Sequence, residues 1–93
     1  MNIRYVTQYG WFKKTYNGPD EIRKDFEDFG KALKEHDIEL LFWAGSYGVP
    51  EPVMYAIKFK DVSVFEKASR DMVFMTKSPV DRTRTIFGWD YTA

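Results

Sequence analysis

Residues 38–60, IELLFWAGSYGVPEPVMYAIKFK, hold two short apolar runs separated by turn-forming residues. The first run, residues 38–44, is interrupted only by Glu39 and is too short for a stable helix, so it predicts a strand buried on both faces. Residues 45–52 carry two glycines and two prolines, a composition typical of a turn. The second run, residues 53–60, is rich in aliphatic and aromatic residues that favour strands. The stretch therefore predicts a β-hairpin with a long connection.

A predicted helix precedes this hairpin. The cluster at residues 17–20, Asn-Gly-Pro-Asp, breaks the preceding structure and places Pro19 or Asp20 at the start of the helix, which ends near His36. Its apolar residues recur at helical spacing and form one stripe: Ile22, Phe26, Phe29 and Leu33. Gly30 lies inside the helix, where its cost predicts a close approach to the sheet.

A second, shorter helix follows the hairpin. Asp61 can cap it, and Ser63 with Glu66 three residues later also matches a capping box, so two start positions remain open. Its expected inward stripe consists of Phe65, Ala68, Ser69 and Met72. Residues 73–82 are predicted to form an irregular connection.

Extended segments at both ends complete the chain. Residues 3–12 and 83–91 are rich in β-branched and aromatic side chains and predict the first and last strands. The resulting order, β-α-β-β-α-β, predicts an α+β, ferredoxin-like fold with a four-stranded antiparallel sheet. Because no linker or repeat is visible, we expect residues 1–93 to form a single domain.

Composition narrows the class of protein. The 93 residues contain 14 basic and 14 acidic side chains and no cysteine. Because the net charge is zero, we expect neither nucleic acid nor an anionic membrane as a partner. The lack of cysteine excludes a disulfide framework and a cysteine-ligated metal. No leader or long apolar segment is apparent, so we expect a cytoplasmic protein.

Several predicted strands carry apolar residues on both faces, whereas two helices can cover only one face of a sheet. Alternation predicts a helix-facing surface made of odd-numbered residues: Tyr5, Thr7, Tyr9, Val53, Tyr55, Ile57, Phe59, Thr85, Phe87, Trp89 and Tyr91. The opposite face is expected to have an apolar middle and polar ends: Arg4, Val6, Gln8, Met54, Ala56, Lys58, Arg84, Ile86 and Asp90. This pattern predicts a homodimer in which the two sheets face each other, and an edge strand leaves higher oligomers open.

The element order, the double-faced strands and the closing segment resemble the dimeric α/β-barrel superfamily, and within it the small GYD-type and stress-responsive Dabb-like domains. Val80, Arg82, Thr83 and Thr85 match a Val-x-Arg-Thr-x-Thr segment that leads into an aromatic strand. Trp43, Gly45 and Tyr47 match an aromatic residue before a glycine-containing hairpin. The Gly-Tyr-Asp element of the family is missing. The resemblance implies a dimeric barrel, and the superfamily includes cofactor-independent monooxygenases, isomerases and haem enzymes, so it implies no single activity.

Aromatic side chains are the main candidates for a ligand site. Trp11, Trp43, Tyr47 and Tyr55 are predicted to line an apolar pocket between sheet and helices, although aromatic residues at strand spacing also build ordinary cores. Tyr16 is a further candidate near a loop.

Two polar residues complete the predicted site. His36 is the only histidine, and it is either stabilised at a helix C-terminus or available as a ligand or general base. Arg84, like Arg82, can present a guanidinium group to a carboxylate or phosphate, or form an ion pair with Asp90 or a partner chain. No metal-ligand cluster is recognisable, and no cofactor is expected.

The sequence thus predicts a small cytoplasmic dimer that binds a hydrophobic or aromatic molecule between its sheet and helices. Two alternatives remain open. One is a cofactor-independent monooxygenase or isomerase acting on such a molecule, and the other is a non-catalytic structural or regulatory oligomerisation module.

Overall fold

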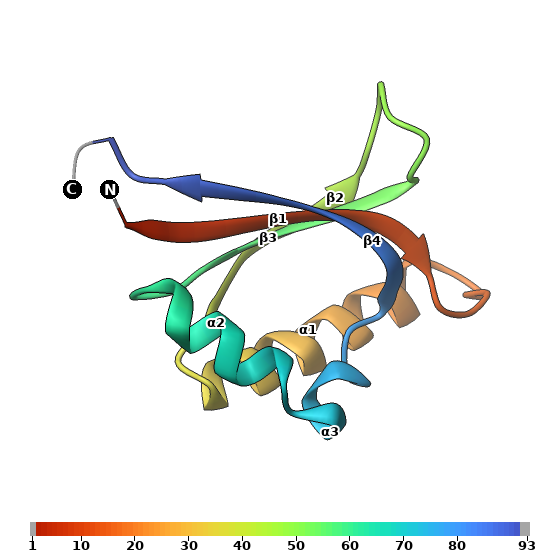
Figure 1. Cartoon of the computed structure of the whole chain (residues 1–93). Coiled ribbons are helices and arrows are strands. Elements are labelled where there is room, and N and C mark those ends of the chain that lie inside the picture. The colour runs from red at the N-terminus through yellow and green to blue at the C-terminus, as the bar shows by residue number, and fades with distance from the viewer. Residues whose placement is uncertain (1, 92–93) are drawn as a thin grey trace.

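The computed structural model describes residues 2–91, with the side chains of Met72 and Val73 outside the description. One antiparallel sheet in the order β2-β3-β1-β4 carries all the helices on one face (Figure 1). The elements are β1 (Ile3–Phe12), α1 (Pro19–Glu35), β2 (Glu39–Gly45), β3 (Val53–Lys58), α2 (Val62–Ser69), α3 (Met72–Met75) and β4 (Val80–Trp89). The predicted α+β, ferredoxin-like fold is confirmed.

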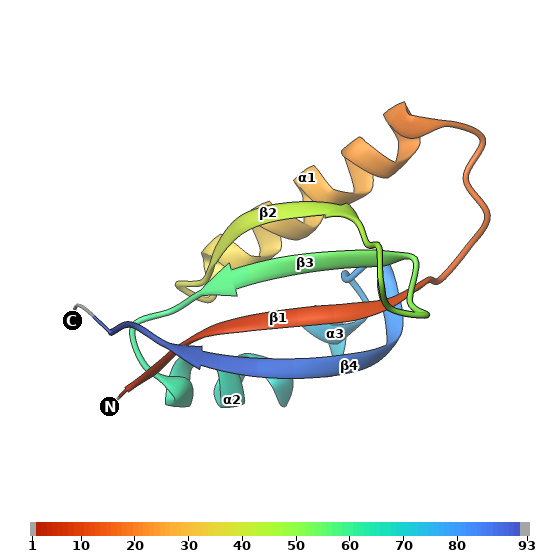
Figure 2. The same cartoon turned by 90° about the horizontal axis from the view of Figure 1, so that it is seen from above.

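The two longer helices divide the covered face of the sheet between them. Helix α1 lies beside β2 and β3, and α2 lies beneath β1 and β4 (Figure 2). No helix of residues 2–91 is both long enough and apolar enough to span a bilayer.

Local signals set the bounds of α1. Pro19 occupies the first turn, together with the acidic Asp20, which suits the positive end of the helix dipole. At the other end, His36 is the C-cap and Asp37 adopts a left-handed backbone with φ 59°. The amide of Ile38 then donates to the carbonyl of Leu33, which satisfies an end carbonyl and turns the chain into β2.

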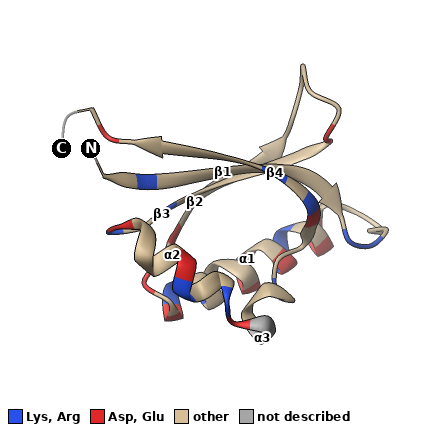
Figure 3. Cartoon of the chain, viewed as in Figure 1, with Lys and Arg blue, Asp and Glu red and all other residues tan. Residues whose placement is uncertain are grey.

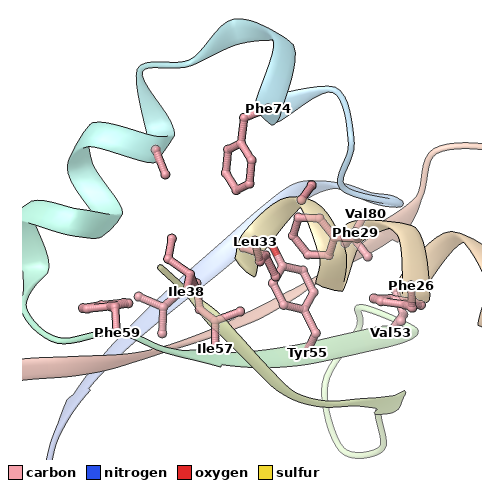
Figure 4. Close-up of a cluster of buried hydrophobic side chains, with 13 residues drawn as sticks. Phe26, Phe29, Leu33, Ile38, Val53, Tyr55, Ile57, Phe59, Phe74 and Val80 are labelled. Carbon is pink, nitrogen blue, oxygen red and sulfur yellow. The ribbon is translucent and has the colours of Figure 1, made fainter. Parts of the chain in front are cut away.

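The core lies between the helices and the sheet (Figure 4). Its members come from every element except β2 and are almost completely buried: Val6, Phe26, Phe29, Ala32, Leu33, Ile38, Val53, Tyr55, Ile57, Phe59, Ala68, Phe74 and Val80. The apolar stripe predicted for α1 contributes Phe26, Phe29 and Leu33 to it. Ala68 supplies the buried side chain of α2, whereas the predicted role of Met72 lies outside the described residues.

The predicted facing of β1 was wrong. Val6, not its odd-numbered neighbours, is fully buried against the helices, because it pairs with Ile57 of β3 and the two side chains share a face. Tyr5 and Tyr9 lie on the outer face instead. There the ammonium of Lys58 lies over the Tyr5 ring and the guanidinium of Arg84 over the Tyr9 ring, an arrangement that suits tyrosine at a polar surface.

The predicted burial of strand two was also wrong. β2 is an edge strand, so in a single chain one of its sides has no neighbouring strand, and Leu41 and Phe42 are exposed. In the last third of the chain, α3 replaces part of the predicted irregular connection, and β4 begins three residues earlier than expected, at Val80.

Gly30 is not explained by a close approach to the sheet. A β-carbon there would lie 3.5 Å from Cδ2 of Leu40, which is ordinary van der Waals contact. Gly10 is the glycine that packing requires, because its β-carbon would lie 2.4 Å from Cγ1 of Val80 and 2.7 Å from the carbonyl oxygen of Asp81.

The outer face of the sheet has an apolar middle. One row of paired residues crosses all four strands: Phe42, Ala56, Thr7 and Ile86. Phe42 is 47% exposed and Ile86 50% exposed in the single chain. Charged residues are concentrated on the helices and loops rather than along the middle of the strands (Figure 3).

Candidate functional site

A cavity of about 340 Å³ lies between the sheet and the helices. Residues from β1, β3 and β4 form its floor, and residues from all three helices form its roof. The apolar lining consists of Phe29, Leu33, Ile38, Tyr55, Ile57, Phe65, Phe74, Met75 and Val80. The polar lining consists of Gln8, Lys13, Ser69, Ser78, Asp81, Arg82 and Thr83. Lys13, Met75, Arg82 and Thr83 are exposed, so the cavity opens to solvent between α3 and the start of β4.

A row of hydrogen bonds begins on the cavity floor at Tyr55 and Gln8 and continues across the sheet to Thr85, which lies outside the lining. The hydroxyl of Tyr55 on β3 donates to Oε1 of Gln8 on β1 over 2.5 Å, and Nε2 of Gln8 donates to Oγ1 of Thr85 on β4 over 3.2 Å. These three residues are directly paired across the strands, so the sheet register aligns them. Burial raises the pKa of Tyr55 to about 12, against an opposing effect of its hydrogen bond with Ser78. Tyr55 is therefore neutral at physiological pH and retains its proton.

Two serines add hydroxyl groups to the cavity wall. Oγ of Ser69 on α2 donates to the carbonyl oxygen of Phe65 over 2.8 Å, a bond that a serine can make within its own helix. Oγ of Ser78 is 3.1 Å from the carbonyl oxygen of Val80 and accepts from the amide of Val80 over 3.2 Å. Both hydroxyls are part-buried and held in place.

An irregularity in the strand pairing shapes the mouth of the cavity. The register of β1 and β4 shifts between Tyr9 and Trp11, and Arg82 opposite has a left-handed backbone with φ 50°. Such bulges change the direction in which side chains point. A left-handed backbone is uncommon for a residue other than glycine. The Arg82 guanidinium lies 5.3 Å from the centroid of the Trp11 ring and 3.6 Å, measured from Nε, from Oδ1 of Asp81. Lys13 sits across the opening, with its ammonium 3.3 Å from the carbonyl oxygen of Met75.

Of the six predicted ligand-binding residues, the structure brings only Tyr55 into this cavity. Trp43 stacks on Phe26 with ring centroids 4.6 Å apart and lines a separate, more open hollow of about 790 Å³ between α1 and β2. Trp11 lies beside Arg82 on the rim of the sheet. Tyr47 is 103% exposed in the connection between β2 and β3 and takes part in neither hollow.

The two polar candidates also lie outside the cavity. His36 packs on Phe74 at a centroid distance of 4.5 Å, and its Nε2 lies 3.5 Å from Oδ2 of Asp71, so it ties the end of α1 to α3. Arg84 forms a two-point ion pair with Glu51, at 2.8 and 3.3 Å, on the outer face of the sheet. Of the alternatives left open for Arg82 and Arg84, the structure thus shows an ion pair for Arg84, with Glu51 as its partner.

Tyr16 lies apart from the cavity as well. Its hydroxyl donates to Oδ2 of Asp25 over 2.7 Å, and its ring packs against Phe12. The hydrogen bond lowers the pKa of Asp25, with a further contribution from Lys14, while burial opposes the shift. This group braces the loop between β1 and α1.

Sequence reasoning missed Gln8, Ser69 and Ser78 as cavity residues. Of these three, Gln8 is the residue that the sequence could have indicated, because it lies between the buried Val6 and Gly10 on the covered face of β1. A polar residue in an inward-facing column indicates a hydrogen-bonding function in the interior.

Within residues 2–91, no three histidine or acidic side chains come close enough together to hold a metal ion. The groups that face the cavity are hydroxyls, one amide and three charged side chains at its mouth.

No protein family and no curated protein matches this sequence. Among solved structures, the crystal structure of a protein of unknown function from Rhodopseudomonas palustris is similar, with a TM-score of 0.57 over 92% of this chain and 80% of that chain. The two sequences are only 12% identical, so the similarity concerns the fold. The chain is ferredoxin-like in architecture, and the similar structure, itself of unknown function, indicates no activity.

Proposed function

We propose that this protein binds a small hydrophobic or aromatic molecule in the cavity between its sheet and helices. The observation that carries the proposal is the combination of an apolar wall with a hydrogen-bonded pair on the floor, Tyr55 and Gln8. Ligand sites are mostly apolar and carry a few fixed polar groups that orient the ligand. An ordinary core would be filled by side chains to crystal-like density.

The size of the cavity agrees with a ligand of one or two rings. A cavity of about 150 Å³ lined by apolar side chains is known to accept benzene, and this one measures about 340 Å³. The larger hollow beside β2 is more open and is lined by charged side chains such as Lys31 and Glu27, which suits a hydrophobic ligand less well.

A filled cavity tests the proposal. Ser69→Leu places a branched apolar side chain from α2 into the cavity, whereas Glu66→Leu adds the same side chain at an exposed position of the same helix. We expect 2-naphthol to shift NMR signals of cavity residues in the wild type and in Glu66→Leu, and to lose this effect in Ser69→Leu. Equal binding by all three proteins would place the ligand elsewhere and contradict the proposal.

We also propose that the protein is a homodimer joined through the outer faces of its sheets. The apolar row Phe42–Ala56–Thr7–Ile86 supports a second copy as the partner, since a self-complementary face needs no other protein and a chain of zero net charge does not repel its own copy. This arrangement agrees with the resemblance to dimeric α/β barrels. A cytoplasmic location stays a prediction.

The enzyme alternative would depend on a reactive polar group inside the cavity. Tyr55 has its pKa raised to about 12 by burial, so it fits a hydrogen-bonding group better than a base at neutral pH. We therefore propose binding and assign no reaction.

A further inference from the structure

We propose that the cavity selects apolar molecules that donate a hydrogen bond, an alcohol or a phenol, over molecules of the same size that only accept one. This inference rests on the proposed function and specifies its ligand class. It follows from the hydrogen bonds that the hydroxyl groups of the cavity wall already donate to other atoms of the protein.

Three hydroxyl groups of the wall, those of Tyr55, Ser69 and Ser78, already have acceptors within the protein, and the fourth, that of Thr83, lies at the exposed mouth. The proton of Tyr55 goes to Oε1 of Gln8, and that of Ser69 goes to the carbonyl oxygen of Phe65. Ser78 lies within hydrogen-bonding distance of the carbonyl oxygen of Val80. The side-chain amide of Gln8 has two hydrogens and donates one of them to Oγ1 of Thr85. Its second hydrogen has no acceptor among these groups.

What these groups retain are lone pairs. A hydroxyl oxygen has two acceptor positions besides its one proton, so the oxygen of Ser69 can still accept, and that of Tyr55 has one position left besides its hydrogen bond with Ser78. A ligand hydroxyl can donate to either oxygen. A ketone or ether oxygen in the same place meets another acceptor, and it gives up its hydrogen bonds to water without replacement.

The charged groups at the mouth have partners within the protein. The ammonium of Lys13 is directed to the carbonyl oxygen of Met75, and the guanidinium of Arg82 lies over the Trp11 ring. Oδ1 of Asp81 is buried and accepts no hydrogen bond, because Arg82 Nε, at 3.6 Å, lies beyond hydrogen-bonding distance. Each of the two cations therefore already has a partner within the protein.

Three probes of similar shape test this inference: 2-naphthol, 2-fluoronaphthalene and 2-naphthaldehyde. The first donates a hydrogen bond, the second has no donor, and the third offers only an acceptor. We expect 2-naphthol to bind about fivefold more tightly than either of the others, the effect of one net hydrogen bond. The affinities can be measured by NMR titration of the wild-type protein.

Two variants identify the accepting oxygens. Ser69→Ala and Tyr55→Phe each remove one of them, and we expect at least one variant to lose the preference for 2-naphthol while it still binds 2-fluoronaphthalene. Tyr91→Phe, at an exposed position, is the control and should retain the preference.

The possible failures are distinguishable. Equal affinity for all three probes, or a preference that survives both variants, overturns this inference and leaves the proposed function standing. Binding of none of the probes overturns the proposed function and this inference together.

Discussion

Gly10 and Val80 lie so close together that a β-carbon on Gly10 would be 2.4 Å from Cγ1 of Val80. The carbonyl oxygen of Asp81 would lie 2.7 Å away and the methyl group of Thr83 3.0 Å away. This contact is where the irregular start of β4 crosses β1, at the mouth of the cavity. The backbone of β4 can approach so closely only because residue 10 has no side chain.

Gly10→Ala should therefore destabilise the protein by about 2 kcal/mol, the usual cost of forcing an extra methyl group into a packed site. Backbone atoms of β4 cannot move aside as a flexible side chain would. Gly30→Ala is the control, since its β-carbon meets Leu40 at an ordinary 3.5 Å, and a helix interior gains roughly 0.5–1 kcal/mol from the exchange. Urea unfolding measures both changes, and equal effects of the same sign would contradict the packing argument.

The ion pair of Glu51 and Arg84 predicts that removing one partner costs more stability than removing the other. Glu51 is only 8% exposed, whereas half of the Arg84 side chain is in contact with solvent. Arg84→Met leaves a buried carboxylate without its partner, so we expect a loss of about 2 kcal/mol. Glu51→Gln leaves a guanidinium that water can reach and should cost less than about 1 kcal/mol. Chemical denaturation of both variants shows which of them loses more stability. The order of the two losses would be reversed if solvent reached Glu51 freely.

The order of elements and the bounds of α1 could be predicted because they depend on local signals. Pro19 begins the helix, and a stripe at helical spacing shows which side of it is buried. The facing of β1 could not be predicted in this way, since both of its faces carry bulky side chains. It is set by the pairing of Val6 with Ile57, a relationship between segments about fifty residues apart.

The site was predictable only in part for the same reason. Tyr55 stands in an alternating strand whose inward face the sequence identifies correctly. Gln8 was assigned to the other face along with the rest of β1, so the Tyr55–Gln8 hydrogen bond could not be foreseen. The left-handed backbone at Arg82 directly follows Val80 and Asp81, which approach Gly10 closely, and no local pattern marks it.

Tyr16→Phe should weaken the protein in a pH-dependent way. The hydrogen bond from Tyr16 is the main cause of the lowered pKa of Asp25, so it favours the folded state when Asp25 is ionised. That stability is fully present above the unfolded pKa of about 3.9 and is lost as the pH falls through the lower folded value. We expect the variant to be about 1 kcal/mol less stable at pH 7, after allowance for the partial exposure of Asp25.

The difference between wild type and Tyr16→Phe should then narrow as the pH falls below about 4, where Asp25 becomes protonated. Urea unfolding at pH 7 and at pH 3 measures it, with Tyr91→Phe as a control whose stability should match the wild type at both values. A gap that stays constant with pH would mean that Tyr16 acts through its packing on Phe12 and not through Asp25.

Ile86→Lys tests the proposed dimer. Ile86 is 50% exposed at one end of the outer-face row, so in a dimer built on this row a lysine there would bury its charge without a partner. We expect the wild type to have the mass of two chains by light scattering at micromolar concentration, and Ile86→Lys to have the mass of one. Met75→Lys replaces a similarly exposed apolar side chain on the helical side and should remain a dimer. A wild-type protein with the mass of a single chain would contradict the paired-sheet arrangement, while the cavity between sheet and helices, formed within one chain, would be unaffected.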